Sequence, residues 1–264
     1  KGGVGKSNTA INLAIQFRKM GKKVVILDAD FGLANIEIMF GAVPKHNLSD
    51  LIYQGKNIKD IITWGPMEVG FISGGSGITG LSNLSKDYLT YIVHNLAELD
   101  TIADVIIVDT GAGISDAVLE FLVASGEILL VTTPEPTSIT DSYSLLKALN
   151  GHPGLERDNT QICMIANRVS TANEGEVLFQ KLDVVVSRYL KLPITYLGAV
   201  PQDPLLAKAV MQQLPVSLQN PQARSAQAYE EIAAKLMKQD EGQNTQKRGV
   251  AAFFSHIIGK RNNG

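Results

Sequence analysis

The sequence predicts an α/β fold: a doubly wound, mainly parallel sheet with helices on both faces. Short runs of β-branched residues alternate along the chain with stretches of helical apolar spacing, the pattern of a parallel sheet covered on both sides. The 264 residues are 45% hydrophobic and 19% charged, which is enough apolar material for one globular domain with a substantial core. Ligands of such sheets bind beyond the carboxyl ends of the strands, so the residues after each strand are the candidates for chemistry.

Strands and helices are expected in alternation, each from its own pattern. A strand is expected where a β-branched run meets turn residues, and a helix where apolar residues recur every three or four positions. The expected strands are 23–27, 69–72, 105–108, 128–132, 161–166 and 194–197. The expected helices are 7–20 (closed by Gly21), 85–100, 115–124, 138–149, 174–189 and 225–238. A further strand is expected before residue 1, to lead into the first motif.

That motif is a glycine-rich loop, Lys-Gly-Gly-Val-Gly-Lys-Ser at 1–7, followed by a helical pattern at 7–17. Glycines let backbone N–H groups crowd around phosphate oxygens, a lysine adds positive charge, and a serine hydroxyl can ligate a nucleotide-bound Mg²⁺. The phosphates would sit at the positive end of the following helix. The loop therefore predicts a site for ATP or ADP with Mg²⁺, formed by Gly2, Gly3, Val4, Gly5, Lys6, Ser7 and Asn8.

Carboxylates follow two of the expected strands. Asp28 and Asp30 come after the strand at 23–27, and Asp109 comes after the very apolar run at 105–108. Asp30 is suited to position or deprotonate a water, and Asp28 to support Mg²⁺ or its water shell. Asp109 stands where a Walker B acid stands, which makes it the better candidate to join Ser7 at the metal.

The loop at 1–7, with its leading lysine Lys1, resembles the deviant Walker A motif of the MinD/ParA family of ATPases. Within that family, Asp-Ala-Asp-Phe-Gly-Leu-Ala-Asn at 28–35, Asp-Thr-Gly-Ala-Gly-Ile-Ser at 109–115 and Glu-Pro-Thr-Ser-Ile-Thr-Asp at 135–141 are most similar to FlhG, also called FleN or YlxH. That group governs flagellar number and placement. The resemblance covers nearly the whole chain and implies a MinD-like ATPase domain over 1–238, with slow, regulatory ATP hydrolysis.

The resemblance also assigns roles to single residues. Lys1 would reach across an ATP-sandwiched homodimer, whereas Lys6 would serve its own nucleotide. Asp30 would be the catalytic aspartate, and Asp109 the acid of the second switch loop. Adenine would be read by Asn167, Pro201 and Asp203. The implied partners are a second copy of the chain, the flagellar GTPase FlhF and proteins of the flagellar switch complex (C-ring).

The end of the chain predicts a membrane-targeting helix at 247–261, joined to the domain by a polar linker at 239–246. One apolar stripe of helical spacing lies between basic residues, as in helices that bind membrane surfaces. The same stripe also suits a helix docked on its own domain. A cytoplasmic protein held reversibly at the inner face of the cell membrane is expected. The stripe consists of Val250, Phe253, Phe254, Ile257 and Ile258.

The net charge and the cysteine content help to decide between this function and other functions of related proteins. The formal net charge is −2, and the last 18 residues carry +4, which leaves −6 for residues 1–246. An acidic body is a poor match for duplex DNA, so no nucleic acid partner is expected and a ParA-type partition ATPase is disfavoured. The single cysteine, Cys163, cannot build an iron–sulfur cluster of four thiolates, even in a homodimer. A MinD-type division-site regulator and a scaffold that does not hydrolyse nucleotide stay open as alternatives.

Overall fold

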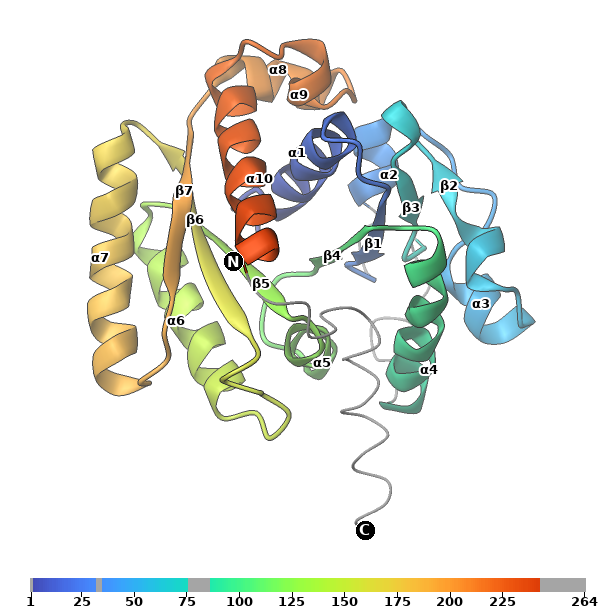
Figure 1. Cartoon of the computed structure of the whole chain (residues 1–264), viewed down its shortest axis with the longest axis horizontal. Helices are drawn as coiled ribbons and strands as arrows, with labels where there is room; N and C mark the ends of the chain where they lie inside the picture. The colour runs from blue at the N-terminus through green and yellow to red at the C-terminus, as the bar shows by residue number, and fades with distance from the viewer. Residues whose placement is uncertain (1, 32–34, 76–85, 243–264) are drawn as a thin grey trace.

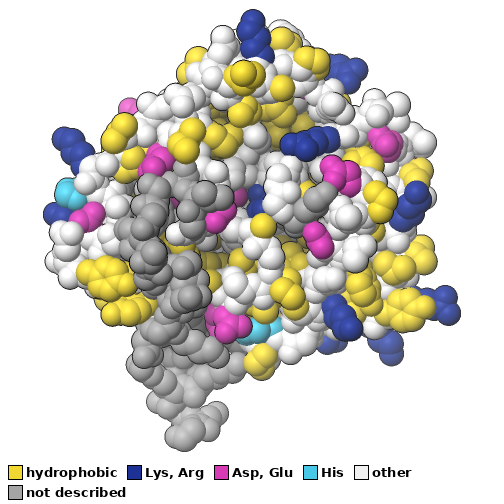
Figure 2. All heavy atoms as spheres, turned by 180° about the vertical axis from the view of Figure 1, so that it is seen from behind, with side chains coloured by type: hydrophobic (Ala, Val, Ile, Leu, Met, Phe, Trp, Pro, Cys, Tyr) yellow, Lys and Arg dark blue, Asp and Glu magenta, His cyan; other side chains and the backbone are white. Residues whose placement is uncertain are grey.

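The computed structural model describes residues 2–31, 35–75 and 86–242 (Figure 1). Lys1, the linker residues 243–246 and the apolar stripe of the expected tail helix lie outside the described residues. Figure 2 shows the molecule from behind, with acidic and basic side chains interspersed over that face.

The described strands form two hydrogen-bonded sheets. The first has the order β2-β3-β1-β4, in which β3 and β4 run parallel to β1, and β2 is antiparallel to β3. The second has the order β5-β6-β7 and is parallel throughout. The strands are β1 Val24–Ala29, β2 Thr63–Trp64, β3 Gly70–Ile72, β4 Val105–Thr110, β5 Glu127–Thr132, β6 Gln161–Val169 and β7 Thr195–Pro201.

Helices cover the sheets on both faces, so the predicted doubly wound α/β fold is confirmed. Helix α7 packs on β6 and β7 from one side, and α10 packs on β7 and α1 from the other (Figure 1). The helices are α1 Lys6–Lys19, α2 Asn35–Phe40, α3 Leu48–Gln54, α4 Lys86–Leu96, α5 Asp116–Ala124, α6 Pro136–Asn150, α7 Ala172–Tyr189, α8 Pro204–Met211, α9 Val216–Gln219 and α10 Arg224–Gly242, with short 3₁₀ turns at Ile58–Ile61, Pro66–Glu68 and Ala97–Thr101.

Helix α10 extends into the segment that the sequence assigned to the linker. Helix α10 continues through Gly242, so residues 239–242, which the sequence assigned to the linker, are helical. The division into a domain at 1–238, a linker and a tail helix stays a prediction.

Helix α1 is the central element of the core. Every residue from Thr9 to Phe17 is buried, on all sides of the helix. Its buried polar side chains are paired with the C-terminal part of the chain: Asn12 Oδ1 accepts from Ser217 N at 3.0 Å, and Gln16 Nε2 donates to Ala226 O at 3.1 Å. Such bonds offset the cost of burying amide groups, so they hold α1 against α9 and α10.

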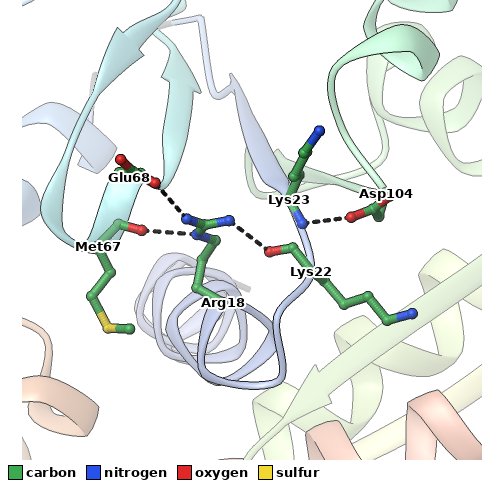
Figure 3. A network of polar contacts seen from close by, with 6 residues as sticks. All are labelled: Arg18, Lys22, Lys23, Met67, Glu68 and Asp104. Carbon is green, nitrogen blue, oxygen red and sulfur yellow. Dashed lines mark hydrogen bonds and ion pairs between the residues drawn. The ribbon is translucent and has the colours of Figure 1, made fainter.

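The far end of α1 is fixed by Arg18 (Figure 3). Its guanidinium donates to Met67 O at 2.8 Å, to Lys22 O at 3.1 Å and to Glu68 Oε2 at 2.8 Å. Met67 and Glu68 have φ of 54° and 58°, a left-handed conformation that non-glycine residues seldom adopt. Arg18 thus holds a strained turn between β2 and β3 and ties it to α1. The helix is anchored at the end opposite to the glycine-rich loop.

The two sheets end at β4 and β5. Residues 105–108 of β4 are all apolar yet only partly buried, whereas every residue of β1 is buried. End strands carry backbone groups that can pair with a further strand. Among the described strands, β4 and β5 are each hydrogen-bonded on one side.

Candidate nucleotide site

The glycine-rich loop runs directly into α1, as predicted. Gly3 and Gly5 have φ of +74° and +96°, in the left-handed region that glycine adopts at little cost. Gly5 is the N-cap residue of α1, and its carbonyl accepts from Thr9 N at 2.9 Å. The first turn of α1 carries no acidic side chain, so nothing within that turn neutralises the positive end of the helix. The loop therefore presents backbone N–H groups where an anion is stabilised.

Asn167 contacts this loop from β6. Its Nδ2 donates to Val4 O at 2.7 Å, and both residues are 3% exposed. A Cβ placed on Gly5 would overlap Asn167 Nδ2, so the amide fills the space that a side chain at position 5 would need. Asn167 Oδ1 is buried without a hydrogen-bond partner among the described residues. The sequence predicted Asn167 as a base-reading residue; the structure places it against the phosphate loop.

Asp109 lies at the carboxyl end of β4, beside Lys6 and Ser7. It is 3% exposed, and burial raises the pKa of its carboxyl to about 6, although a hydrogen bond from Ser7 and the charge of Lys6 act in the opposite direction. Its Oδ2 is buried with no hydrogen-bond partner in the part of the chain that the structure describes. An unpaired carboxylate oxygen beside a serine hydroxyl and a lysine fits a Mg²⁺ ion and phosphate oxygens.

Asp28 is fully buried and pairs in register with Asp109 on the neighbouring strand. Its carboxylate accepts three backbone N–H bonds, from Asp30 at 3.1 Å, Asn35 at 3.0 Å and Ile36 at 3.2 Å. Burial and the charge of Asp109 nevertheless raise the pKa of Asp28 to about 7. The side chain thus caps the first residues of α2, a role that the sequence did not indicate. Support of Mg²⁺ by Asp28 stays a prediction.

Asp30 lies beside the loop that follows β4. Asn35 Nδ2 donates to its Oδ2 at 3.5 Å, and a Cβ built on Gly111 would lie 3.2 Å from its Oδ1. The next residue, Phe31, packs on Phe121 of α5 with ring centroids 6.2 Å apart. The loops after β1 and β4 are therefore in contact, and glycine at 111 leaves the space that Asp30 occupies. Sequence reasoning missed Phe121 and the close approach of Gly111, although the glycine directly after Asp109-Thr110 was a visible signal.

Pro201 and Asp203 lie at the end of β7 and before α8. Asp203 Oδ1 accepts from Leu205 N at 2.9 Å, while Oδ2 accepts from Ser225 N at 3.0 Å and from Ser225 Oγ at 2.8 Å. Burial raises the pKa of Asp203, but these hydrogen bonds outweigh it and bring the pKa below its ordinary value. Its side chain joins α8 to α10. Base recognition by Pro201 and Asp203 stays a prediction.

Two features are absent from the residues that the structure describes. No helix among them is both long and apolar enough to cross a membrane. The described ranges also contain no group of three or more His, Cys, Asp or Glu side chains that could hold a metal ion. Magnesium commonly uses one or two carboxylates together with substrate phosphates rather than an all-protein cage.

A glycine-rich loop at the start of a buried helix, with a lysine, a serine and a strand-end aspartate around it, defines a P-loop nucleotide-binding protein. The family model ParA, described as NUBPL iron-transfer P-loop NTPase, matches residues 1–237. The chain therefore belongs to the ParA/MinD family of P-loop NTPases, and the family resemblance of the sequence is confirmed.

Two characterised relatives carry flagellar names. The antiactivator FleN of Pseudomonas aeruginosa is 37% identical over 236 residues, covering 89% of this chain and 83% of that protein. The flagellum site-determining protein YlxH of Helicobacter pylori is 33% identical over 262 residues, covering 98% of this chain and 87% of that protein. Among solved structures, the septum site-determining protein MinD of Pyrococcus horikoshii in complex with Mg-ADP has a TM-score of 0.75 at 23% identity, covering 91% of this chain and 93% of that one. This last likeness shows the fold.

The raised pKa of Asp109 predicts a pH-dependent affinity for Mg²⁺–ATP. A carboxyl with a pKa of about 6 is ionised above that pH and protonated below it, and only the ionised form is a good Mg²⁺ ligand. We expect the affinity to fall by up to about tenfold per pH unit below pH 6. The triphosphate also gains a proton in this range, so titration calorimetry should compare wild type with Asp109→Asn. Parallel pH profiles for the two proteins would contradict the prediction.

Proposed function

We propose that the chain is an ATPase that dimerises with ATP, binds a membrane surface through its C-terminal segment and regulates flagellar number and placement. The observation that carries the nucleotide part is the cluster of Lys6, Ser7 and the unpaired Asp109 oxygen at the start of α1. The flagellar part is supported by the names of the two relatives, FleN and YlxH.

Each residue of the cluster has a distinct task in this proposal. Loop N–H groups and Lys6 bind phosphate oxygens, and Ser7 with Asp109 holds Mg²⁺. When bound, Mg²⁺ neutralises charge that develops on the phosphates. Asp30, next to Gly111 and reached by the Asn35 amide, orients the attacking water and accepts its proton. Slow hydrolysis suits this role, because the protein acts through its nucleotide-dependent state and not through the ADP and phosphate that it releases.

The proposed change of state is dimerisation and membrane binding with ATP, both of which hydrolysis reverses. Lys1 contacts the nucleotide of the second copy and so makes dimerisation depend on ATP. Each basic side chain near an anionic surface contributes about 1 kcal/mol, so one copy of the tail binds reversibly. Two linked copies raise the apparent affinity by roughly 10² or more. Nucleotide state is thereby converted into occupancy of the inner face of the cell membrane.

The proposal predicts ATP-dependent binding to vesicles. Full-length protein saturated with a non-hydrolysable ATP analogue should be dimeric by light scattering and should co-sediment with anionic vesicles, whereas protein with ADP should stay in the supernatant. Phe254→Asp should abolish sedimentation while ATP affinity is unchanged, because a charge in the apolar stripe opposes burial in lipid. Val184→Asp is a matched control, since Val184 is 63% exposed on α7. A monomer that stays off vesicles with the analogue would refute the proposal.

Other members of the family differ from this proposal in testable ways. A MinD-type division-site regulator shares the fold, so co-purification with division inhibitors rather than with FlhF or C-ring proteins would favour it. A ParA-type partition ATPase would bind duplex DNA, whereas the body of this chain is acidic and its charges are interspersed on the face seen in Figure 2. Iron transfer, as in the description of the family model, would need thiolate ligands, and the sequence holds one cysteine.

A further inference from the structure

The strand β6 is irregular where it meets the phosphate loop. Its register with β7 shifts between Asn167 and Val169, and the residue between them, Arg168, has φ of +58°. A bulge of this kind turns a side chain away from the direction that regular pleating would give it. Non-glycine residues in the left-handed region cost free energy and are retained where surrounding structure requires them. The irregularity begins at Asn167, the residue of β6 that donates to Val4 O of the loop.

The bond from Asn167 fixes a peptide plane in the loop. Nδ2 donates to Val4 O at 2.7 Å, so the carbonyl of the Val4–Gly5 peptide points at Asn167. In a planar trans peptide the C=O and N–H vectors are antiparallel. The N–H of Gly5 therefore points away from Asn167, to the opposite side of that peptide. A carbonyl turned the other way would present an acceptor, rather than a donor, to an anion.

Gly5 and Asn167 are also matched sterically. Gly5 has φ of +96°, and the amide of Asn167 fills the place of its missing side chain. Both Val4 and Asn167 are 3% exposed, so water cannot readily replace the bond if Asn167 is removed. The two residues are 163 positions apart in the sequence, so this hydrogen bond connects β6 of the second sheet to the glycine-rich loop.

We propose that Asn167 is a positioning residue of the phosphate site: by holding the Val4 carbonyl, it aims the Gly5 N–H at the phosphate of the bound nucleotide. This inference rests on the proposed nucleotide binding and deepens it. It differs from base recognition, which the sequence predicted for Asn167, because the bond acts on the loop and not on the nucleoside. Phosphate affinity is then set in part by a residue of β6.

The test uses inorganic tripolyphosphate with Mg²⁺, a probe that has no base. Isothermal titration of the full-length protein should show that Asn167→Ala weakens binding of tripolyphosphate and of ATP by a similar factor, about tenfold, the value of a hydrogen bond between buried groups. Asn167→Ser serves as a second variant if the alanine protein folds poorly. The serine side chain is too short to restore the bond to Val4 O, so this variant should lose the same affinity as Asn167→Ala.

Asn150→Ala is the matched control. Asn150 also donates its Nδ2 to a backbone carbonyl, Leu190 O at 3.2 Å, and its Oδ1 is also buried without a partner among the described residues. Loss of its bond should lower the unfolding temperature and leave tripolyphosphate affinity unchanged. If Asn167→Ala weakens ATP but not tripolyphosphate, the residue acts on the base and the inference is overturned. If wild type binds neither ligand, the proposed function itself fails.

Discussion

Replacing Gly5 with alanine should lower ATP affinity by at least about 100-fold. Gly5 has φ of +96°, a conformation that costs a residue with a Cβ about 1–2 kcal/mol. The new methyl group would also overlap Asn167 Nδ2, so either the loop or the amide must move. Displacing the amide breaks the bond to Val4 O, which adds about 1 kcal/mol. These two costs sum to about 2–3 kcal/mol, and the steric overlap adds to them, so the total reaches roughly two powers of ten in affinity.

Two glycines separate the steric cost from the conformational one. Gly3→Ala places a Cβ at φ of +74° with no atom within 4 Å, so it should weaken ATP binding less than Gly5→Ala does. Gly21→Ala, at φ of +82° in an equally open site after α1, should lower stability by about 1 kcal/mol and leave ATP affinity unchanged. Equal losses of affinity in Gly3→Ala and Gly5→Ala, measured by titration calorimetry, would show that the contact with Asn167 is irrelevant.

The fold was predictable where the sequence pattern was long. Strands such as 105–108 and helices such as 174–189 repeat one periodicity over enough residues to be recognised. The short helices α2, α3, α8 and α9 were not expected, because a helix of a few residues shows little periodicity and is held by tertiary contacts. The bond from Gln16 Nε2 to Ser217 Oγ of α9, at 3.2 Å, is one such contact, and no local sequence pattern predicts it.

The sequence predicted which residues lie at the candidate site, but it did not predict all of their contacts. The loop at 1–7 and the strand-end acids were visible because spacing and strand topology alone bring them to one edge. In the structure, however, Asp28 and Asp203 cap helices, and the Asn167 side chain donates to Val4 O. These outcomes depend on the closing of a turn, a helix junction and a bulge, none of which a single strand-end residue encodes.

Replacing Asp30 with alanine should lower kcat by about 10²–10⁴ while ATP affinity stays close to that of wild type. Asp30 is only partly buried and lies beside Gly111, after β4, so its loss should leave the backbone N–H groups of the glycine-rich loop in place. The measurement is phosphate release in a single turnover, together with calorimetric ATP binding. Asp30→Asn should be nearly as slow as Asp30→Ala, because an amide fills the same volume but cannot accept a proton. Full activity in Asp30→Asn would assign the water-activating role elsewhere.

If Asp30 is the catalytic aspartate of the proposed function, its position should matter as well as its charge, and Gly111 allows that to be tested without changing Asp30 itself. A Cβ at 111 would lie 3.2 Å from Asp30 Oδ1, closer than ordinary packing permits, so Gly111→Ala must displace the carboxylate. The shift required is a few tenths of an ångström. Because a misplacement of about 1 Å in an active site can cost about 100-fold in rate, kcat should fall by a smaller factor than this and less than in Asp30→Ala. Gly126→Ala, with no atom within 4 Å of its new Cβ, should hydrolyse ATP like wild type. Since Gly111 contributes no functional group, a loss of rate there with unchanged ATP affinity can arise only through its neighbours. Unchanged turnover in Gly111→Ala would mean that the contact between the two loops does not position the catalytic acid.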